Sequence, residues 1–207
     1  MIYMLLDWTI HIVLCLVGGF LLTEIAGYFI HHLLHSNAIH WLSRYHMIHH
    51  LRDYGPGKSL RSEKYICSAD GRASILDFGF EWVIPILTLL VGMEVVFGFF
   101  QAHMVTRVLF PAFCLIYGYF SFSMMHDAMH LKNWWMLKHP FLKKWFLAAR
   151  RSHDLHHMII ADDGLMKFNF GISFYFIDKI LGTFTKEGQS FNQKGYEQAL
   201  KRYDYVL

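Results

Sequence analysis

The chain has 207 residues, of which 55% are apolar, 17% are aromatic and only 17% are charged, and its net charge is +3. Soluble domains carry about 25% charged residues, so this chain has too little charge to cover a water-facing surface. The apolar fraction excludes intrinsic disorder, and the lack of any repeat excludes collagen and coiled coils. The small net charge gives no support to nucleic-acid binding.

Three long apolar runs account for the excess of apolar residues. They cover residues 8–30, 82–100 and 108–125, and the first two hold one formal charge each, Glu24 and Glu94. A helix over each run is about 27–35 Å long at 1.5 Å per residue, which matches the roughly 30 Å core of a bilayer. Buried helices of a soluble core are the alternative, but too little polar sequence remains to enclose three of them. The sequence therefore predicts an all-α integral membrane helical bundle with three to four transmembrane helices.

Basic residues give the orientation of these spans. Six of the 19 Lys and Arg residues fall within residues 36–81, and twelve fall within 126–207. The positive-inside tendency therefore predicts that both segments are cytoplasmic and that the N-terminus lies on the opposite side. Because the first run is too long for a cleaved signal peptide, we expect it to remain as the first span. No linker divides the chain, so residues 1–207 are expected to form one membrane-embedded domain.

The segments between and after the runs are polar or mixed. Residues 51–72 contain Gly-Pro-Gly and many charges, which predicts a loop. Residues 132–151 mix aromatic and basic side chains, which is typical of a helix lying at a membrane interface, with an ordinary solvated helix as the alternative. The polar C-terminal part predicts a short helix over 194–204, to which the sequence assigns no chemistry.

Ten of the fifteen histidines fall into four clusters with helical spacing. Two clusters are pairs at i and i+4, and two are trios at i, i+3 and i+4, so each places its imidazoles on one helix face. Because two clusters directly follow the first and third apolar runs, all four are expected in a histidine-rich helical cap on the cytoplasmic side. The clusters are His31 and His35; His46, His49 and His50; His126 and His130; and His153, His156 and His157.

This number of imidazoles predicts a site for more than one metal ion. Ten exceed the four ligands of one tetrahedral zinc ion and suit two ions with about five nitrogens each. Imidazole binds iron, zinc, copper and nickel alike, so the ligand type does not select the metal. No cysteine joins the clusters, which excludes iron–sulfur and thiolate–zinc sites. Surface histidines clustered by chance are the alternative interpretation.

Further motifs accompany the clusters. The first pair stands in Tyr-Phe-Ile-His-His-Leu-Leu-His at 28–35, and the last trio is followed by Asn-Phe-Gly at 169–171 and by Asp178 and Gly-Thr at 182–183. Together with the clusters, this order resembles the fatty acid hydroxylase/sterol desaturase superfamily, from about residue 24 to residue 183. The chain departs from that pattern at His32, where the family commonly has Arg. Its His-Asp-Ala-Met-His at 126–130 is more similar to the carotenoid hydroxylases.

The resemblance implies an integral membrane, non-haem diiron oxygenase. Such an enzyme uses O2 and two electrons to hydroxylate or desaturate a lipid, here a fatty acyl chain, a sphingoid base, a sterol or a carotenoid. It implies that the ten clustered histidines bind two iron ions, although zinc can misload such a site. The chain has no dinucleotide-binding motif and no cysteine cluster, so we expect a separate electron donor of the ferredoxin or cytochrome b5 type.

Metal-bound imidazoles usually give their second N–H to a carboxylate or a carbonyl. Glu24 lies seven residues before His31 on the same helix face and is a candidate for this role, with helix packing as the alternative. Asn169 and Asp178 instead suit a role in holding the C-terminal segment against the histidines. The complete set of candidates around the ligands is Glu24, His32, Asp127, Asp154, Asn169 and Asp178, and His40 and His139 are further histidines close to the clusters in sequence.

A membrane divalent-metal transporter or metal-binding protein is the alternative function. A transporter is expected to hold its ion near the middle of the membrane with access from both faces. Here the spans are almost entirely apolar, and the clusters are predicted on one side. A bis-histidine haem carrier would need paired histidines on facing spans. A metalloprotease would need His-Glu-x-x-His, which is absent from the sequence.

Overall fold

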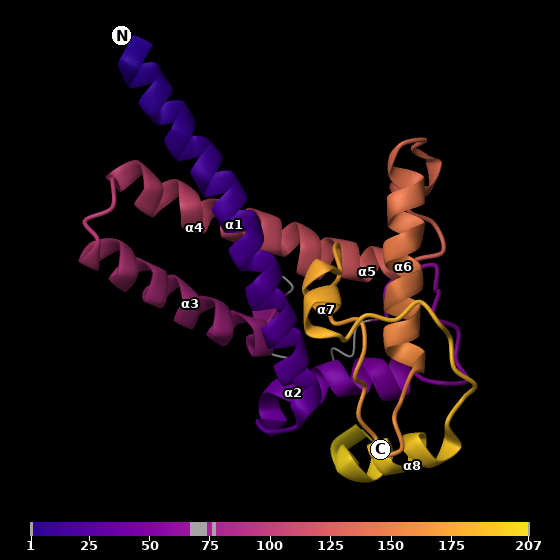
Figure 1. The fold of residues 1–207 in the computed structure, drawn as a ribbon. Helices are drawn as coiled ribbons and strands as arrows, with labels where there is room; N and C mark the ends of the chain where they lie inside the picture. The colour runs from indigo at the N-terminus through magenta and orange to yellow at the C-terminus, as the bar shows by residue number, and fades with distance from the viewer. Residues whose placement is uncertain (1, 67–73, 76–77, 207) are drawn as a thin grey trace.

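The computed structural model describes residues 2–66, 74–75 and 78–206, and most of these residues are helical (Figure 1). The strands are one short antiparallel pair, Ser74–Ile75 (β1) with Phe78–Gly79 (β2). The predicted all-α class is therefore confirmed. Residues 54–66 lie outside helices, as expected for the loop, whereas residues 51–53 of the predicted loop belong to a π-helix that starts at His49. Residues 67–72 of the predicted loop lie outside the described residues.

Three helical segments in the described residues are long and apolar enough to cross a membrane. They coincide with the three predicted runs, and the third continues without a break into the first residue of a histidine pair, His126. The segments are Trp8–Ser36, within α1 (Ile2–Ser36); Trp82–Phe99, within α3 (Phe80–Phe99); and Met104–Met129, which comprises α4 (Met104–Gly118), the π-helix η2 (Tyr119–Met125) and α5 (His126–Met129).

Small residues on α1 allow α4 to pack closely against it. A Cβ atom at Gly19 would lie 2.7 Å from the Phe113 ring, and one at Gly27 would lie 1.8 Å from the Phe122 ring. Inside a bilayer the hydrophobic effect does not drive helices together. The close packing that small residues allow is therefore what holds spanning helices together. In contrast, α3 diverges from α1 and α4 (Figure 1), and no residue in its most apolar stretch is buried.

The remaining helices form a cap at one end of the spans. The predicted helix over 132–151 is wrong in its bounds, because a 3-10 turn, η3 (Trp135–Lys138), precedes α6 (Leu142–Met158). His139 is extended, with φ −91° and ψ 120°, because the following Pro140 disfavours helical backbone in the residue before it. The other cap elements are α2 (His40–Ile48), the π-helix η1 (His49–Asp53), α7 (Phe176–Leu181), α8 (Gln193–Arg202) and the 3-10 turn η4 (Asp204–Val206).

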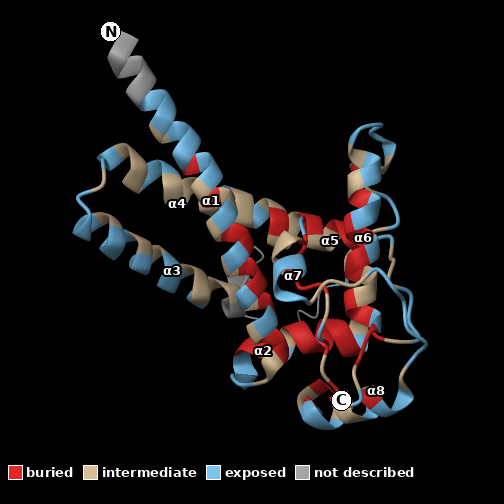
Figure 2. Ribbon diagram, viewed as in Figure 1, coloured by how far each residue is buried: buried red, intermediate tan, exposed pale blue. Residues whose placement is uncertain are grey.

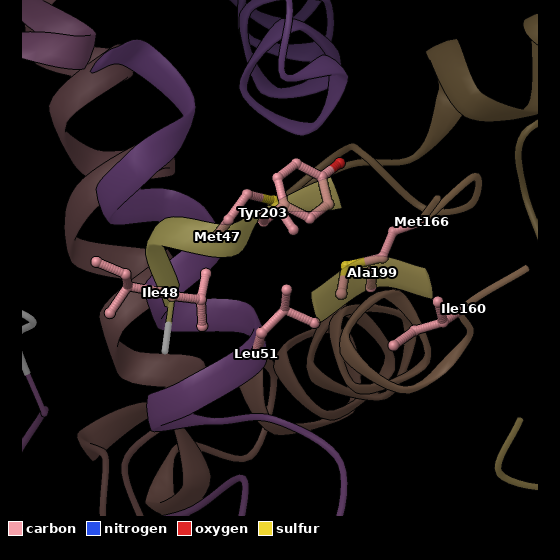
Figure 3. Close-up of a cluster of buried hydrophobic side chains, with 8 residues drawn as sticks. Met47, Ile48, Leu51, Ile160, Met166, Ala199 and Tyr203 are labelled. Atoms are coloured by element: carbon pink, nitrogen blue, oxygen red, sulfur yellow. The ribbon is translucent and has the colours of Figure 1, made fainter. Parts of the chain in front are cut away.

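Two hydrophobic cores hold the cap together, and burial is concentrated where α2, α5 and α6 meet (Figure 2). One core joins α5 to α6 and the segment before α7 through residues such as Met129, Phe146 and Ile172. The other joins α2 and η1 to the C-terminal residues, with Met47 and Tyr203 among its members (Figure 3). Eight of the ten clustered histidines belong to, or directly follow, the helices that these cores join, α2, η1, α5 and α6.

Candidate metal centre

The ten clustered histidines converge in two groups of five. Within each group the nearest ring nitrogens all lie within 4.8 Å of one another. Nine of the ten residues are buried, and His126 is half-buried. Group one consists of His31, His35, His46, His50 and His156, and group two consists of His49, His126, His130, His153 and His157.

Helical geometry explains how four clusters become two groups. The pairs each enter one group intact, His31 with His35 and His126 with His130. Each trio is instead divided, because its i and i+4 residues enter one group and its i+3 residue enters the other. Consecutive helical residues are about 100° apart around the axis, so an i+3 residue points well away from the i+4 residue. Each trio therefore directs two imidazoles toward one group and the third toward the other.

The spacing of the ring nitrogens fits a metal ion. Ligands about 2.0–2.1 Å from one ion have neighbouring nitrogens about 2.9–3.4 Å apart in octahedral to tetrahedral arrangements. In group one, the Nε2 atom of His35 lies 2.9 Å from that of His46 and 3.0 Å from that of His156. In group two, the Nε2 atom of His153 lies 3.0 Å from that of His130 and 3.2 Å from that of His157.

Hydrogen bonds on the other side of the rings determine which nitrogens carry protons. The Nδ1 atom of His31 lies 2.6 Å from the Phe170 carbonyl oxygen, and that of His156 lies 2.7 Å from the Phe168 carbonyl oxygen. A carbonyl only accepts, so both Nδ1 atoms donate a proton. Burial lowers the pKa of His156 to about 4, so its ring has no second proton near neutral pH. The unprotonated Nε2 atom of His156 therefore faces the Nε2 atom of His31 at 3.1 Å, and a cation bound between the two rings would stabilise this arrangement.

Group two shows the same pattern with fewer hydrogen bonds. The Nδ1 atom of His130 donates to the Leu60 carbonyl oxygen at 3.2 Å, which leaves its Nε2 atom as an acceptor. The buried Nε2 atoms of His49 and His126, like that of His50 in group one, have no hydrogen-bond partner among the described residues. Burying an unpaired polar atom is costly, and a metal ion would compensate it. Burial, followed by neighbouring imidazoles, lowers the pKa well below its ordinary value for His49, His50, His153 and His157.

The segment that supplies the Phe168 and Phe170 carbonyls is itself held by Asn169 and Asp178. Asp178 accepts hydrogen bonds from the backbone N–H groups of Phe170 at 2.7 Å and Gly171 at 2.8 Å. Asn169 has φ +59°, and its amide donates to two backbone carbonyls at 3.0 Å. Neither side chain contacts a clustered histidine, so both support the ligands through this segment. Burial raises the pKa of Asp178 against the opposing effect of its hydrogen bonds.

The family model described as fatty acid hydroxylase matches residues 16–183. The chain belongs to this family. The match includes the four histidine clusters and ends at Thr183, before α8. Searches of curated proteins and of solved structures each returned no match. For this fatty acid hydroxylase family member, membership indicates a membrane oxidoreductase that acts on lipids, with histidine groups able to hold metal ions.

The aspartates proposed to support the ligands differ in what they contact. Asp127 contacts a clustered histidine directly, with its Oδ1 atom 3.0 Å from the Nδ1 atom of His126. Asp154 instead forms a two-oxygen ion pair with Arg61, with both distances 2.6 Å. Because Arg61 adjoins Leu60, this pair fixes the chain whose carbonyl accepts from His130. Asp154 thus supports group two indirectly, through Arg61 and the Leu60 carbonyl.

The other candidates lie outside both groups. Glu24 is buried between α1 and α4 and accepts a hydrogen bond from the Tyr117 hydroxyl, which matches the helix-packing alternative. His32 is exposed, and its ring centroid lies 4.8 Å from that of Phe170. His40 and His139 are also exposed.

Sequence reasoning missed three groups that orient the ligands, the backbone carbonyls of Leu60, Phe168 and Phe170. Any residue type supplies a carbonyl, so residue identity carries no information on such a role. For Phe168 and Phe170, the Asn-Phe-Gly motif at 169–171, which follows Phe168 and contains Phe170, was the sequence feature that marked this segment. For Leu60, the sequence holds none.

Proposed function

We propose that this chain is a membrane-bound non-haem diiron oxygenase that hydroxylates or desaturates a lipid. It would use O2 and two electrons from a separate ferredoxin-type or cytochrome b5-type donor. The observation that carries this proposal is the pair of five-imidazole groups whose ring nitrogens converge at metal-ligand spacing. Each group would hold one iron ion, because the reaction requires a metal that changes valence and zinc does not.

The iron pair would supply the oxidising power, with two electrons from the donor and two protons. In hydroxylation one oxygen atom of O2 would enter a C–H bond as hydroxyl and the other would leave as water. In desaturation two hydrogens would be removed from the lipid and both oxygen atoms would leave as water. The protein itself keeps the imidazole ligands neutral, holds them in a fixed orientation and shields them from water. Burial lowers the pKa of six imidazoles in the cap and so keeps them unprotonated near neutral pH: those of His49, His50, His130, His153, His156 and His157. Aromatic rings then restrict their motion: the ring of Tyr54 stacks on that of His130 with centroids 4.0 Å apart. Phe170 contacts His31, His35 and His156.

A cavity of about 770 Å³ between α1, α3 and α4 supports a lipid substrate. Its walls are almost entirely apolar, and they lie within the three spanning segments, so a hydrocarbon chain in the bilayer suits it. At the cap end the walls include Ile30, which precedes His31, and Phe122, which stands four residues before His126. Other wall residues are Leu22, Ala26, Trp82, Leu87, Met93 and Leu115.

We also propose that the histidine groups face the cytoplasm and that the N-terminus lies on the opposite side. Eighteen of the 19 Lys and Arg residues belong to the two segments assigned to the cytoplasm, which agrees with the positive-inside tendency. A single cysteine introduced near the N-terminus should then be labelled by an impermeant thiol reagent only from the non-cytoplasmic face. Labelling from the cytoplasmic face would reverse the orientation.

Metal analysis tests the proposed function first. We expect about two iron ions per chain in detergent-purified protein, and a coupled pair in the Mössbauer spectrum of an iron-57 preparation. Zinc in the purified protein calls for anaerobic reloading with iron(II) before the measurement. If no iron binds even then, the proposal is wrong. Turnover of a lipid with NAD(P)H and O2 by the purified chain alone would contradict the separate donor.

A further inference from the structure

The C-terminal residues 192–206 lie beyond the family match, which ends at residue 183. They nevertheless pack directly on the helices that carry the histidines. Ala199, Tyr203 and Val206 form one buried core with Met47, Ile48 and Leu51, which alternate with His46, His49 and His50 along α2 and η1 (Figure 3). This segment therefore covers the ligand helices on the side opposite the histidine rings.

Tyr203 makes the closest link between this segment and group one. Its side chain is fully buried, and its hydroxyl donates a hydrogen bond to the backbone carbonyl of His35. His35 stands one residue before the end of α1. The last carbonyls of a helix have no partner within the helix, so this hydroxyl satisfies a carbonyl that would otherwise be left unpaired and fixes the backbone that carries the His35 ring.

A second link lies at the turn between α1 and α2. The side-chain amide of Asn37 donates to the Arg202 carbonyl oxygen at 2.8 Å, and its oxygen lies 3.1 Å from the Tyr205 hydroxyl. Asn37 has φ +56°, a conformation that Asn and Gly adopt more readily than other residues. The other end of the segment is tied down by Asn192, whose amide donates to the Ile160 carbonyl oxygen at 3.1 Å.

We propose that Tyr203 is a positioning residue for the metal ion of group one. This inference rests on the proposed metal-binding function. By holding the end of α1 to the C-terminal segment, Tyr203 and Asn37 set how far His31 and His35 stand from His46. Group two takes no ligand from α1, so its metal ion does not depend on this link.

The test compares metal binding at the two groups in the full-length protein. Cobalt(II) is titrated into metal-free, detergent-solubilised protein, and its visible absorption reports each ion. In Tyr203→Phe we expect one of the two ions to bind about 10- to 100-fold more weakly, as is typical when a residue that supports a ligand is removed. The other ion should keep its affinity and its spectrum.

Tyr175→Phe is the matched control. The Tyr175 hydroxyl is also buried and donates to a backbone carbonyl, that of Ala149 at 3.1 Å, but no ligand lies at that carbonyl. Both ions should bind this variant as they bind the wild type. If Tyr203→Phe does not fold, Asn37→Gly keeps the positive φ, removes the Arg202 and Tyr205 contacts, and is judged by the same criterion.

The outcomes separate the two proposals. Wild-type protein that binds no cobalt and no iron overturns the proposed function and this inference together. Wild-type protein that binds two ions while the variant binds both unchanged overturns this inference alone. Equal weakening of both ions also overturns it, because a merely structural role would loosen the whole cap.

Discussion

Asp178 offers a sharp test of how the metal groups are held. Its carboxylate accepts three hydrogen bonds: the Oδ1 atom from the Phe170 N–H at 2.7 Å and the Thr183 hydroxyl at 2.9 Å, and the Oδ2 atom from the Gly171 N–H at 2.8 Å. In Asp178→Asn the amide oxygen replaces Oδ1 and keeps two of these bonds. The amide nitrogen then replaces Oδ2 and faces the Gly171 N–H, donor against donor.

The expected loss follows from these contacts. A hydrogen bond to a charged acceptor contributes about 1.5–3 kcal/mol, and one between neutral groups about 0.5–1.5 kcal/mol. One charged bond is lost and two are weakened by about 1–1.5 kcal/mol each, so we expect Asp178→Asn to lower the free energy of unfolding by about 3–6 kcal/mol. For a chain of this size that corresponds to a fall in Tm of about 6–24 °C. Because the Phe170 carbonyl orients His31, the group-one metal ion should also bind about tenfold or more weakly.

Thermal unfolding in detergent and cobalt(II) titration measure both effects. Asp163→Asn is the control: Asp163 is exposed and pairs with Lys167 at 2.6 Å, and exposed ion pairs contribute about 1 kcal/mol or less. The reasoning is refuted if Asp178→Asn melts within a degree or so of the wild type and binds both metal ions with unchanged affinity.

Three further predictions follow from the same geometry. His49→Ala and His156→Ala should each lower bound metal and abolish lipid turnover, whereas His32→Ala should keep the wild-type metal content; full metal content and activity in both ligand variants would contradict the ligand assignment. Ala26→Phe should narrow the cavity and lower lipid turnover while metal analysis shows both ions retained, and unchanged turnover would argue against substrate binding there. In metal-free protein the pKa of His156 lies at about 4 in the folded state against about 6.5 when unfolded. The neutral His156 ring therefore contributes about 3 kcal/mol to the free energy of unfolding above pH 6.5, and this contribution is lost as the pH falls toward 4. A Tm that stays constant over that range would contradict this prediction.

The spanning helices and the histidine clusters were predictable because both depend on local sequence. Hydropathy over about 20 residues specifies a span, and helical spacing specifies which imidazoles share a helix face. The start of α6 was not predicted. The aromatic and basic residues from 132 onward suggested a helix, but Pro140 disfavours helical backbone at the residue before it, and α6 begins at Leu142. The division of each trio between two groups was not predicted, because residues that share a helix face about 100° wide can still contact two neighbouring sites.

The roles of the supporting residues depended on contacts between distant segments. Asp154 and Glu24 are carboxylates close to histidines in sequence, yet Asp154 pairs with Arg61 and Glu24 with Tyr117 on another helix. No spacing rule connects residues 93 positions apart. Tyr203 is the clearest case, because its partner is a backbone carbonyl and the C-terminal helix carries no motif.

The division of the trios has a consequence for how the two metal groups relate. His49 and His50 are neighbours in η1 but belong to different groups, and so are His156 and His157 in α6. The rings of His50 and His157, one from each group, stack with centroids 3.9 Å apart. Two rigid helices, and not loops, therefore fix the separation of the groups. In the proposed oxygenase both metal ions give electrons to one O2 molecule, and this helical arrangement would hold the ten imidazoles together as one centre.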